Sequence, residues 1–217
     1  MDEGRAAEDA RMMTRLGWDD VRGALDARPA TRVPAGQVRR AAVALVLRDG
    51  PSGIQLLFIR RAEHPEDPWS GQMAFPGGRA EPGDPDLRAT AVRETEEEIG
   101  VDLAREAEYL GALDEVRAAA RLRPVDLAIS PFVFRLLGDA SLRPNDEVRS
   151  LHWIALDELV REERRSMMDY SHQGSTLQFP CLRVEDVVIW GLTYRMFVGL
   201  QERFPSRATP PAAGPPR

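Results

Sequence analysis

The sequence contains no lysine, and all 29 residues counted as lysine or arginine are arginine. A Schiff-base lysine and the phosphate-binding lysine of a P-loop are therefore excluded. Arginine remains, and its guanidinium group suits bidentate contact with phosphate. Cys181 is the only cysteine, so the chain can form neither an internal disulfide nor a cluster of thiolate metal ligands. We expect Cys181 to be a small buried hydrophobic residue.

Long apolar runs and excess positive charge are also missing. No apolar stretch approaches the length of a membrane span, and the first five residues, Met-Asp-Glu-Gly-Arg, lack a signal-peptide pattern. The formal net charge of −6 argues against a general electrostatic affinity for nucleic acid or for acidic membrane surfaces. We therefore expect a cytoplasmic enzyme that acts on a small molecule.

The chain has 217 residues, of which 43% are hydrophobic, enough for one packed domain with extensions. Leu16, Val21 and Leu25 fit helical spacing and predict a short N-terminal helix. The expected organisation is an N-terminal extension (1–35), a main domain (36–205) and a disordered proline-rich tail (206–217). The first and last helices could form the face of a homodimer, or their apolar residues could pack into the core.

Short apolar or alternating segments between turn residues predict β-strands. The expected strands are 41–47, 55–60, 73–75, 107–113, 125–137, 147–154, 176–182 and 187–188, and the later helices are 156–160 and 190–204. Pro131 indicates an edge strand or a bulge. Residues 114–124 are predicted to form a loop or partial helix. Few helices among many short strands predict an α/β sandwich with a mixed sheet.

Carboxylates are densest between residues 77 and 101. Asp84 is a good helix N-cap, Pro85 suits the first helical position, and Gly100 suits the C-terminal stop. The sequence therefore predicts a helix over residues 85–99. Its packed face should hold residues that share one arc of a helical wheel, namely Leu87, Ala91, Val92, Thr95 and Ile99.

Glu98 falls between Leu87 and Ala91 on this wheel, with Glu94 one turn earlier and Glu97 alongside, whereas Glu96 points away. Carboxylates seldom lie at the edge of a core without a positive partner. Arg93 can reach Glu97 at i+4, but one arginine cannot neutralise three acids. A hard divalent cation such as Mg²⁺ can. The alternative is a solvated surface helix rich in glutamate.

Other candidate residues lie before this helix. Arg60 and Arg61 end a predicted strand near the glycine turn, where they either contact substrate or lie on the surface. Trp69 could cover a ligand, but packing beneath its loop is the expected role. None of the three histidines is within metal-ligand spacing of another, so all three are expected to be structural or solvent-facing.

The stretch resembles the Nudix box, the signature of hydrolases of nucleoside diphosphates linked to another moiety. The matching residues are Gly78, Arg93, Glu94, Glu97, Glu98, Gly100 and Val101. Asp84 replaces the first glutamate of the signature, eight residues rather than seven precede Arg93, and Thr95 stands at an apolar position. Asp84 is accounted for by its capping role.

These departures resemble the coenzyme A pyrophosphatase branch of the family. Three further segments agree with it: residues 56–61 with Leu-Leu and Arg-Arg, residues 70–78 (Ser-Gly-Gln-Met-Ala-Phe-Pro-Gly-Gly), and residues 189–193 (Ile-Trp-Gly-Leu-Thr). The resemblance covers roughly residues 38–203. It implies a Nudix α/β/α sandwich and Mg²⁺- or Mn²⁺-dependent hydrolysis of coenzyme A or its thioesters. The products would be 3′,5′-adenosine diphosphate and 4′-phosphopantetheine.

Two alternatives stay open. One is a Nudix hydrolase for another nucleoside diphosphate derivative, such as ADP-ribose, a nucleotide sugar or a dinucleotide. The other is a non-catalytic Nudix regulator that binds a nucleotide as an effector. The intact Arg93, Glu94, Glu97 and Glu98 argue against the regulator.

The resemblance also implies roles for individual residues. Glu94 and Glu98 would be metal ligands, and Glu97 would bind the metal directly or through a water. The Gly77 carbonyl oxygen would complete the coordination shell of the metal. Arg93 would orient the acids. Glu147, six residues before Trp153, is the candidate general base, although a surface acid at a strand edge is the alternative. The expected substrate contacts are Arg60, Arg61 and Gly78, with Arg117, Arg121 and Arg123 as further candidates for extra phosphates.

Overall fold

The computed structural model describes residues 15–34, 36, 38–64, 69–118, 126–172 and 175–204. The helices are α2 (Trp18–Asp26), α3 (Leu87–Ile99), α4 (Leu103–Glu106), α5 (Leu156–Leu159), α6 (Gly191–Gln201) and the 3₁₀ helix η1 (Glu162–Arg164). The strands are β1 (Arg39–Gly50), β2 (Gly53–Arg61), β3 (Met73–Ala74), β4 (Gly77–Arg79), β5 (Ala107–Ala112), β6 (Val116–Ala118), β7 (Leu127–Leu136), β8 (Val148–Ala155), β9 (Arg165–His172), β10 (Ser175–Val184) and β11 (Val187–Trp190). The predicted tail at 206–217 lies outside the described residues.

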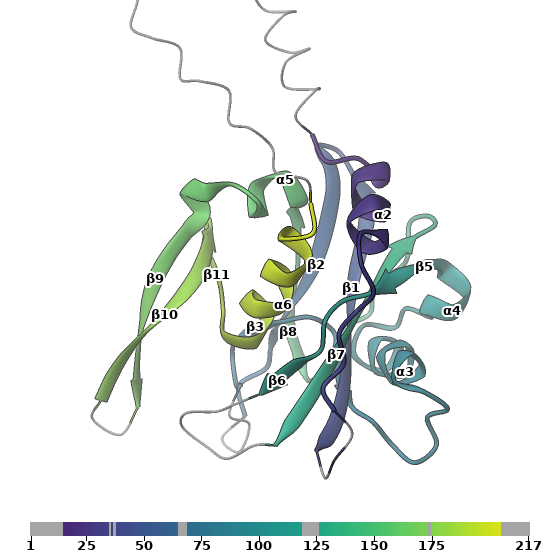
Figure 1. The fold of residues 1–217 in the computed structure, drawn as a ribbon, viewed down its shortest axis with the longest axis horizontal. Helices are drawn as coiled ribbons and strands as arrows, with labels where there is room; N and C mark the ends of the chain where they lie inside the picture. The colour runs from purple at the N-terminus through teal and green to yellow at the C-terminus, as the bar shows by residue number, and fades with distance from the viewer. Residues whose placement is uncertain are drawn as a thin grey trace, which may run out of the picture.

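The main sheet has eight strands and is mixed. Its central path runs β3-β2-β1-β7-β5, while β4 pairs with β1, β6 with β7 and β8 with β2. Strands β1 and β7 are parallel, and the other pairs are antiparallel. A second sheet, β11-β10-β9, is antiparallel, and β9 and β10 project away from the main sheet in Figure 1.

Two apolar clusters cover the two faces of the main sheet. Alternation along β2 divides its side chains, because successive residues of a strand point to opposite faces. Phe58 joins a cluster with residues of α2, α5, α6 and β10, whereas Leu57 joins a cluster with residues of α3 and α4. Helices on both faces make this the predicted α/β/α sandwich (Figure 1). Among the described residues, no helix is both long enough and apolar enough to span a membrane.

The predicted N-terminal helix is present as α2. Val21 and Leu25 are buried in the same cluster as Phe197 of α6, so core packing accounts for the apolar residues of both helices. The Trp18 indole donates a hydrogen bond to Asp49 Oδ1 at 2.8 Å and lies against the Arg135 guanidinium. Cys181 is fully buried, as expected for a small hydrophobic residue.

Helix α3 ends where the sequence predicts but begins two residues later. Gly100 is the C-cap in the left-handed region at φ 71°, and its N–H donates to Glu96 O. Asp86 rather than Asp84 is the N-cap, since its side chain accepts from Ala89 N at 2.8 Å. The prediction that Asp84 is the cap is therefore wrong. Both aspartates suit this position, and Asp84 is bound elsewhere, by Arg93 and Thr90.

Four strand predictions need correction, and one of them is β4, which forms where a glycine turn was expected. Residues 116–118 form β6 rather than a loop or partial helix, and three residues are too few to give a strand pattern. Strand β7 has partners on both sides, so the edge alternative for Pro131 is wrong, whereas the bulge alternative is not contradicted. Pro131 O accepts from Leu113 N at 3.0 Å, between the ends of β5 and β6. Strand β9 was not predicted, since its exposed residues carry no apolar run.

Candidate active site

Two glycines bring β4 against the acidic helix α3. The Gly77 amide donates a hydrogen bond to Glu98 Oε2 at 2.8 Å. Gly77 has φ 149°, and a Cβ there would overlap the Ala42 carbonyl oxygen. A Cβ on Gly78 would overlap the Glu94 carboxylate. The missing side chain of Gly77 therefore lets β4 lie close to β1, and that of Gly78 leaves room for the Glu94 carboxylate of α3.

Glu98 is a carboxylate at the end of the core. It is 3% exposed, and its Oε1 lies 3.7 Å from Arg61 Nη1. Burial raises the pKa of Glu98 to about 7, the Gly77 amide and Arg61 oppose the rise, and the charges of Glu94 and Glu147 add to it. Burial also raises the pKa of Glu94, against the lowering effect of Arg93. Burial thus disfavours the charged forms of both carboxylates.

Arg93 connects Asp84, which precedes α3, to the glutamates of that helix. Its Nε and Nη2 donate to Asp84 at 3.0 and 3.1 Å, and its Nη1 lies 3.1 Å from Glu94 and 3.2 Å from Glu97. Asp84 also accepts from the Glu81 amide. The Arg93 hydrogen bonds are the main cause that holds the pKa of Asp84 well below its usual range. Asp84 thus fixes the guanidinium that holds Glu94.

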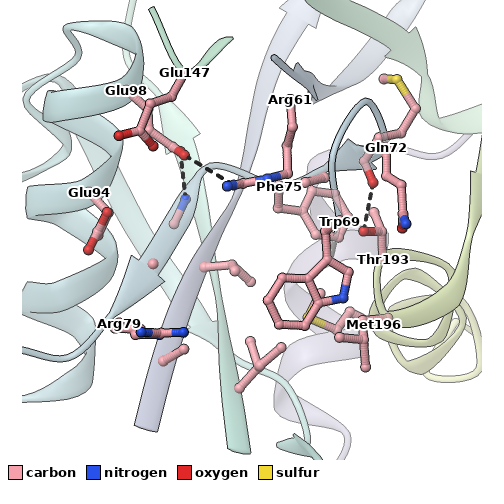
Figure 2. A pocket seen from close by; sticks show the side chains of 18 of the residues that line it. Arg61, Trp69, Gln72, Phe75, Arg79, Glu94, Glu98, Glu147, Thr193 and Met196 are labelled. Atoms are coloured by element: carbon pink, nitrogen blue, oxygen red, sulfur yellow. Dashed lines mark hydrogen bonds and ion pairs between the residues drawn. The ribbon is translucent and has the colours of Figure 1, made fainter. Parts of the chain in front are cut away.

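A pocket of about 600 Å³ opens beside these acids. Glu94, Glu98 and Glu147 line one end, with Arg61 next to Glu98 (Figure 2). The lining also includes an apolar floor, which we define as Ala41, Val43, Leu127 and Ile129 of the sheet with Leu192 and Met196 of α6. The pocket can therefore receive a charged group at the acid end and an uncharged group against the floor.

The pocket brings together most of the predicted site residues. Those that line it are Arg61, Gly77, Gly78, Glu94, Glu98 and Glu147. Arg93 lies behind Glu94, and Glu97 is held by Arg93 with its side chain 57% exposed, outside the lining.

Two other predicted arginines, Arg60 and Arg117, are not in the lining of the pocket. Arg60 is not in the lining although its neighbour Arg61 is, and the register of the β2–β8 pair shifts between these two residues. Arg60 lies near His152 instead and helps to lower the pKa of that imidazole, mainly lowered by burial. Arg117 forms an exposed ion pair with Asp126. Arg121 and Arg123 lie outside the described residues.

Sequence reasoning missed several lining residues. Arg79 lines the pocket from β4, and alternation could not place its side chain because a glycine turn was expected there. His64 lines the pocket rather than facing only solvent. Trp69 packs against the core, as expected, and also lines the pocket. Met196 had no sequence signal, because only the fold brings α6 here.

The acid end has donors that suit a hard divalent cation. Within the described part of the chain, no three His, Cys, Asp or Glu side chains converge closely enough to hold a metal ion by themselves. Mg²⁺, however, is usually held by one or two carboxylates together with waters and substrate phosphates. Glu94 and Glu98 are such a pair, and a nearby cation would favour the charged forms that burial disfavours. The residues present therefore fit a metal that the substrate helps to bind.

Comparison with known proteins agrees with this geometry. The sequence model of the NUDIX domain matches residues 38–172. The "Uncharacterized Nudix hydrolase NudL" of Yersinia pestis (strain Pestoides F) is 34% identical over 158 residues, which cover 71% of this chain and 74% of that protein. A solved structure, the MutT/nudix family protein from Enterococcus faecalis, is similar with a TM-score of 0.51 over 89% of this chain and 72% of its own, at 16% identity.

The structural likeness supports the fold alone, but the sequence matches decide the family. The NUDIX match covers more than half of the chain, and it includes all the acids of the pocket. Hydrolases of this family typically depend on a divalent metal, in keeping with the donors at the acid end. The chain therefore belongs to the Nudix family, as a hydrolase of a diphosphate-linked substrate.

Proposed function

We propose that this Nudix hydrolase cleaves the diphosphate linkage of coenzyme A or a coenzyme A thioester. The products are 3′,5′-adenosine diphosphate and 4′-phosphopantetheine or its acyl derivative. One observation carries the proposal: the three segments that resemble the coenzyme A branch meet at a single pocket. Residues 56–61, 70–78 and 189–193 are far apart in the sequence, yet each contributes to the lining.

Specific contacts hold these segments together. Ile59 pairs with Ala74 in the β2–β3 ladder, which joins the first segment to the second. The buried Thr193 hydroxyl donates to the Met73 carbonyl oxygen at 2.9 Å, which joins the second to the third (Figure 2). A buried polar group without a partner is costly, so this bond fixes the first turn of α6 against β3.

The shape of the pocket also supports a large two-part substrate. A diphosphate fits the acid end once a cation is bound, and the apolar floor offers an uncharged surface to the rest of the molecule. Arg61 is 25% exposed beside Glu98, so it can contact a phosphoryl oxygen while it still balances the acid.

Glu94 and Glu98 would hold Mg²⁺ or Mn²⁺, with the Gly77 carbonyl as a further ligand and Glu97 acting through water. When bound, the metal polarises a phosphoryl oxygen and lowers the pKa of a coordinated water. A water oxygen adds to one phosphorus and the bridging P–O bond breaks, so both halves leave as phosphate monoesters. Arg93 keeps Glu94 in place throughout.

Glu147 accepts the proton of the attacking water in this proposal. Its side chain lines the pocket near Glu94 and Glu98, whose pKa values it raises by repulsion. Its backbone is fixed from both sides, because Glu147 N donates to Asn145 Oδ1 at 2.9 Å and Glu147 O accepts from Ala62 N at 2.7 Å. A base held in this way can stay within reach of the reacting water.

A substrate panel tests the proposal. The purified protein is incubated with Mg²⁺ or Mn²⁺ and coenzyme A, acetyl-coenzyme A, ADP-ribose, a nucleotide sugar or a dinucleotide, and the products are separated by chromatography. We expect the highest kcat/KM with coenzyme A or its thioester, with 3′,5′-adenosine diphosphate as a product. Turnover of ADP-ribose with coenzyme A untouched would overturn the substrate assignment. Binding without turnover of any compound would favour a regulator.

Gly78→Ala tests whether the position of Glu94 matters for activity. The new Cβ must displace the Glu94 carboxylate, which is the far end of a flexible side chain. We expect kcat/KM to fall about 100-fold, the usual effect of misplacing a reacting group by about 1 Å. The free energy of unfolding should change by only about 1 kcal/mol.

The matched control for this variant is Gly83→Ala, since a Cβ at Gly83 meets nothing within 4 Å. It should retain activity. Equal activity of the two variants would show that Glu94 is not needed in its observed position.

A further inference from the structure

We propose that Arg79 binds a second phosphate group, a monoester on the nucleoside half of the substrate and separate from the diphosphate. The site would thus select phosphorylated nucleosides. This inference rests on the proposed function, which it deepens by assigning the direction in which the substrate lies.

Arg79 differs from the other arginines of the site in having no acidic partner. Among the described residues, its side chain makes no hydrogen bond or ion pair, and its carbonyl oxygen accepts from Arg93 Nη2 at 3.0 Å. Arg93 is saturated by Asp84, Glu94 and Glu97, and Arg61 lies against Glu98. A guanidinium that lines a pocket without a carboxylate is available to an anion, which it can bind through two parallel N–H groups.

The register of the sheet places this cation at the border of the apolar floor. Arg79 is directly opposite Ala41 in the β4–β1 pair, and Ala41 is opposite Ile129 in the β1–β7 pair. Residues opposite one another have side chains on the same face, so Arg79 stands in line with two residues of the floor. All three line the pocket.

The same register separates Arg79 from the metal end. Gly77, whose amide binds Glu98, is two residues earlier in β4, a distance of about 7 Å along an extended strand. Figure 2 shows Arg61 next to Glu98, whereas Arg79 lies beyond Glu94. The two arginines therefore serve two different anionic groups.

The chemistry of the second group follows from its surroundings. It must be anionic to pair with Arg79, and it must be attached to something that an apolar floor accepts. A ribose with a phosphate monoester on one hydroxyl and a diphosphate on another meets both conditions, because the two phosphates are one sugar ring apart. Its base would then lie over Ala41, Ile129 and Met196.

The test compares coenzyme A with dephospho-coenzyme A, which has the same diphosphate but lacks the 3′-phosphate. In Arg79→Ala we expect kcat/KM for coenzyme A to fall about 10- to 100-fold, the range for a lost hydrogen bond to a charged group. The loss with dephospho-coenzyme A should be at least tenfold smaller. Arg79→Lys should recover part of the preference, since lysine keeps the charge but not the bidentate geometry.

The control is Arg105→Ala, because the Arg105 side chain is 85% exposed on α4. It should treat both substrates as the wild type does. An equal loss with both substrates in Arg79→Ala would overturn the proposal, because Arg79 would then act on the diphosphate or on the fold. The absence of any loss would overturn it as well.

A binding experiment separates this inference from the proposed function. Titration calorimetry with adenosine 3′,5′-bisphosphate and adenosine 5′-monophosphate needs no turnover. We expect the wild type to bind the bisphosphate at least tenfold more tightly, and Arg79→Ala to bind both alike. If the wild type hydrolyses neither coenzyme A nor its dephospho form, the substrate assignment fails, yet this titration still decides the role of Arg79. Equal binding of both nucleotides by the wild type would refute it.

Discussion

Glu98→Gln should lower kcat/KM about 1,000-fold, equivalent to about 4 kcal/mol, while the fold stays intact. The substitution removes the charge of one of the two carboxylates proposed to hold the metal. The carbonyl oxygen of the new side-chain amide can still accept the Gly77 N–H, and the side chain has nearly the same volume. Activity is measured with the preferred substrate of the panel, and stability by thermal unfolding without metal.

Two further measurements sharpen this test. Without metal, the melting temperature of Glu98→Gln should equal or exceed that of the wild type, because a buried charge is costly. Added Mn²⁺ should stabilise the wild type more than the variant, since a ligand that binds only the folded state raises its stability. Glu96→Gln, an exposed position on the same helix, is the control. Activity within a few-fold of the wild type would contradict the role of α3 as the metal helix.

Asp114→Asn should destabilise the protein by about 3 kcal/mol, because it breaks a partly buried ionic network. Asp114 accepts from Arg28, from the Thr31 amide at 2.7 Å and from Arg203 at 3.1 Å. The Arg203 side chain is only 2% exposed, so the substitution leaves a buried guanidinium without its counter-charge. The network ties the N-terminal segment to the residues after α6, and denaturant unfolding measures its contribution.

The pH dependence of this effect is a specific signature. Hydrogen bonds from Arg28 are the main cause that lowers the pKa of Asp114, with smaller effects from the Thr31 amide and the Arg203 charge. A group whose pKa is lower in the folded state stabilises that state. This stabilisation is complete above the pKa of the unfolded state, about 3.9 for aspartate, and it is lost as the pH falls through the pKa of the folded state. The difference between wild type and Asp114→Asn should therefore be largest near neutral pH and shrink below about pH 4.

The control for the network is Asp126→Asn. Asp126 pairs with Arg117, and both side chains are more than half exposed. Such surface pairs contribute about 0–1 kcal/mol. If both variants lost the same free energy of unfolding, the burial of Arg203 would not be the cause of the destabilisation in Asp114→Asn.

Local features were predicted well where a few adjacent residues decide them. The end of α3 follows from Gly100 alone, because that glycine adopts a left-handed conformation. Its start was missed by two residues because Asp84 and Asp86 are both competent caps, and only the contact of Asp84 with Arg93 distinguishes them. Strand β6 was missed because its three residues are held by pairing with β7, which a sequence pattern cannot show.

The candidate site divides in the same way. Glu94 and Glu98 were assigned together because residues four apart share one face of a helix. Arg60 and Arg61 could not be separated, since the facing of each depends on the strands paired with β2. Glu97 matched the family signature, yet its side chain is exposed and bound to Arg93.

The sequence by itself determined local features of this protein: a helix with acids at i and i+4 that ends at Gly100, a glycine pair before it, and the absence of lysine. These depend on local geometry and composition, which neighbouring residues determine. Only the tertiary structure decided which of those groups share a pocket and what faces them. Met73 and Thr193, 120 residues apart, meet through one buried hydrogen bond, and Arg79 lies in line with Ala41 and Ile129 through strand register. Such contacts arise from packing between segments that are distant in the sequence, so no local sequence pattern could predict them.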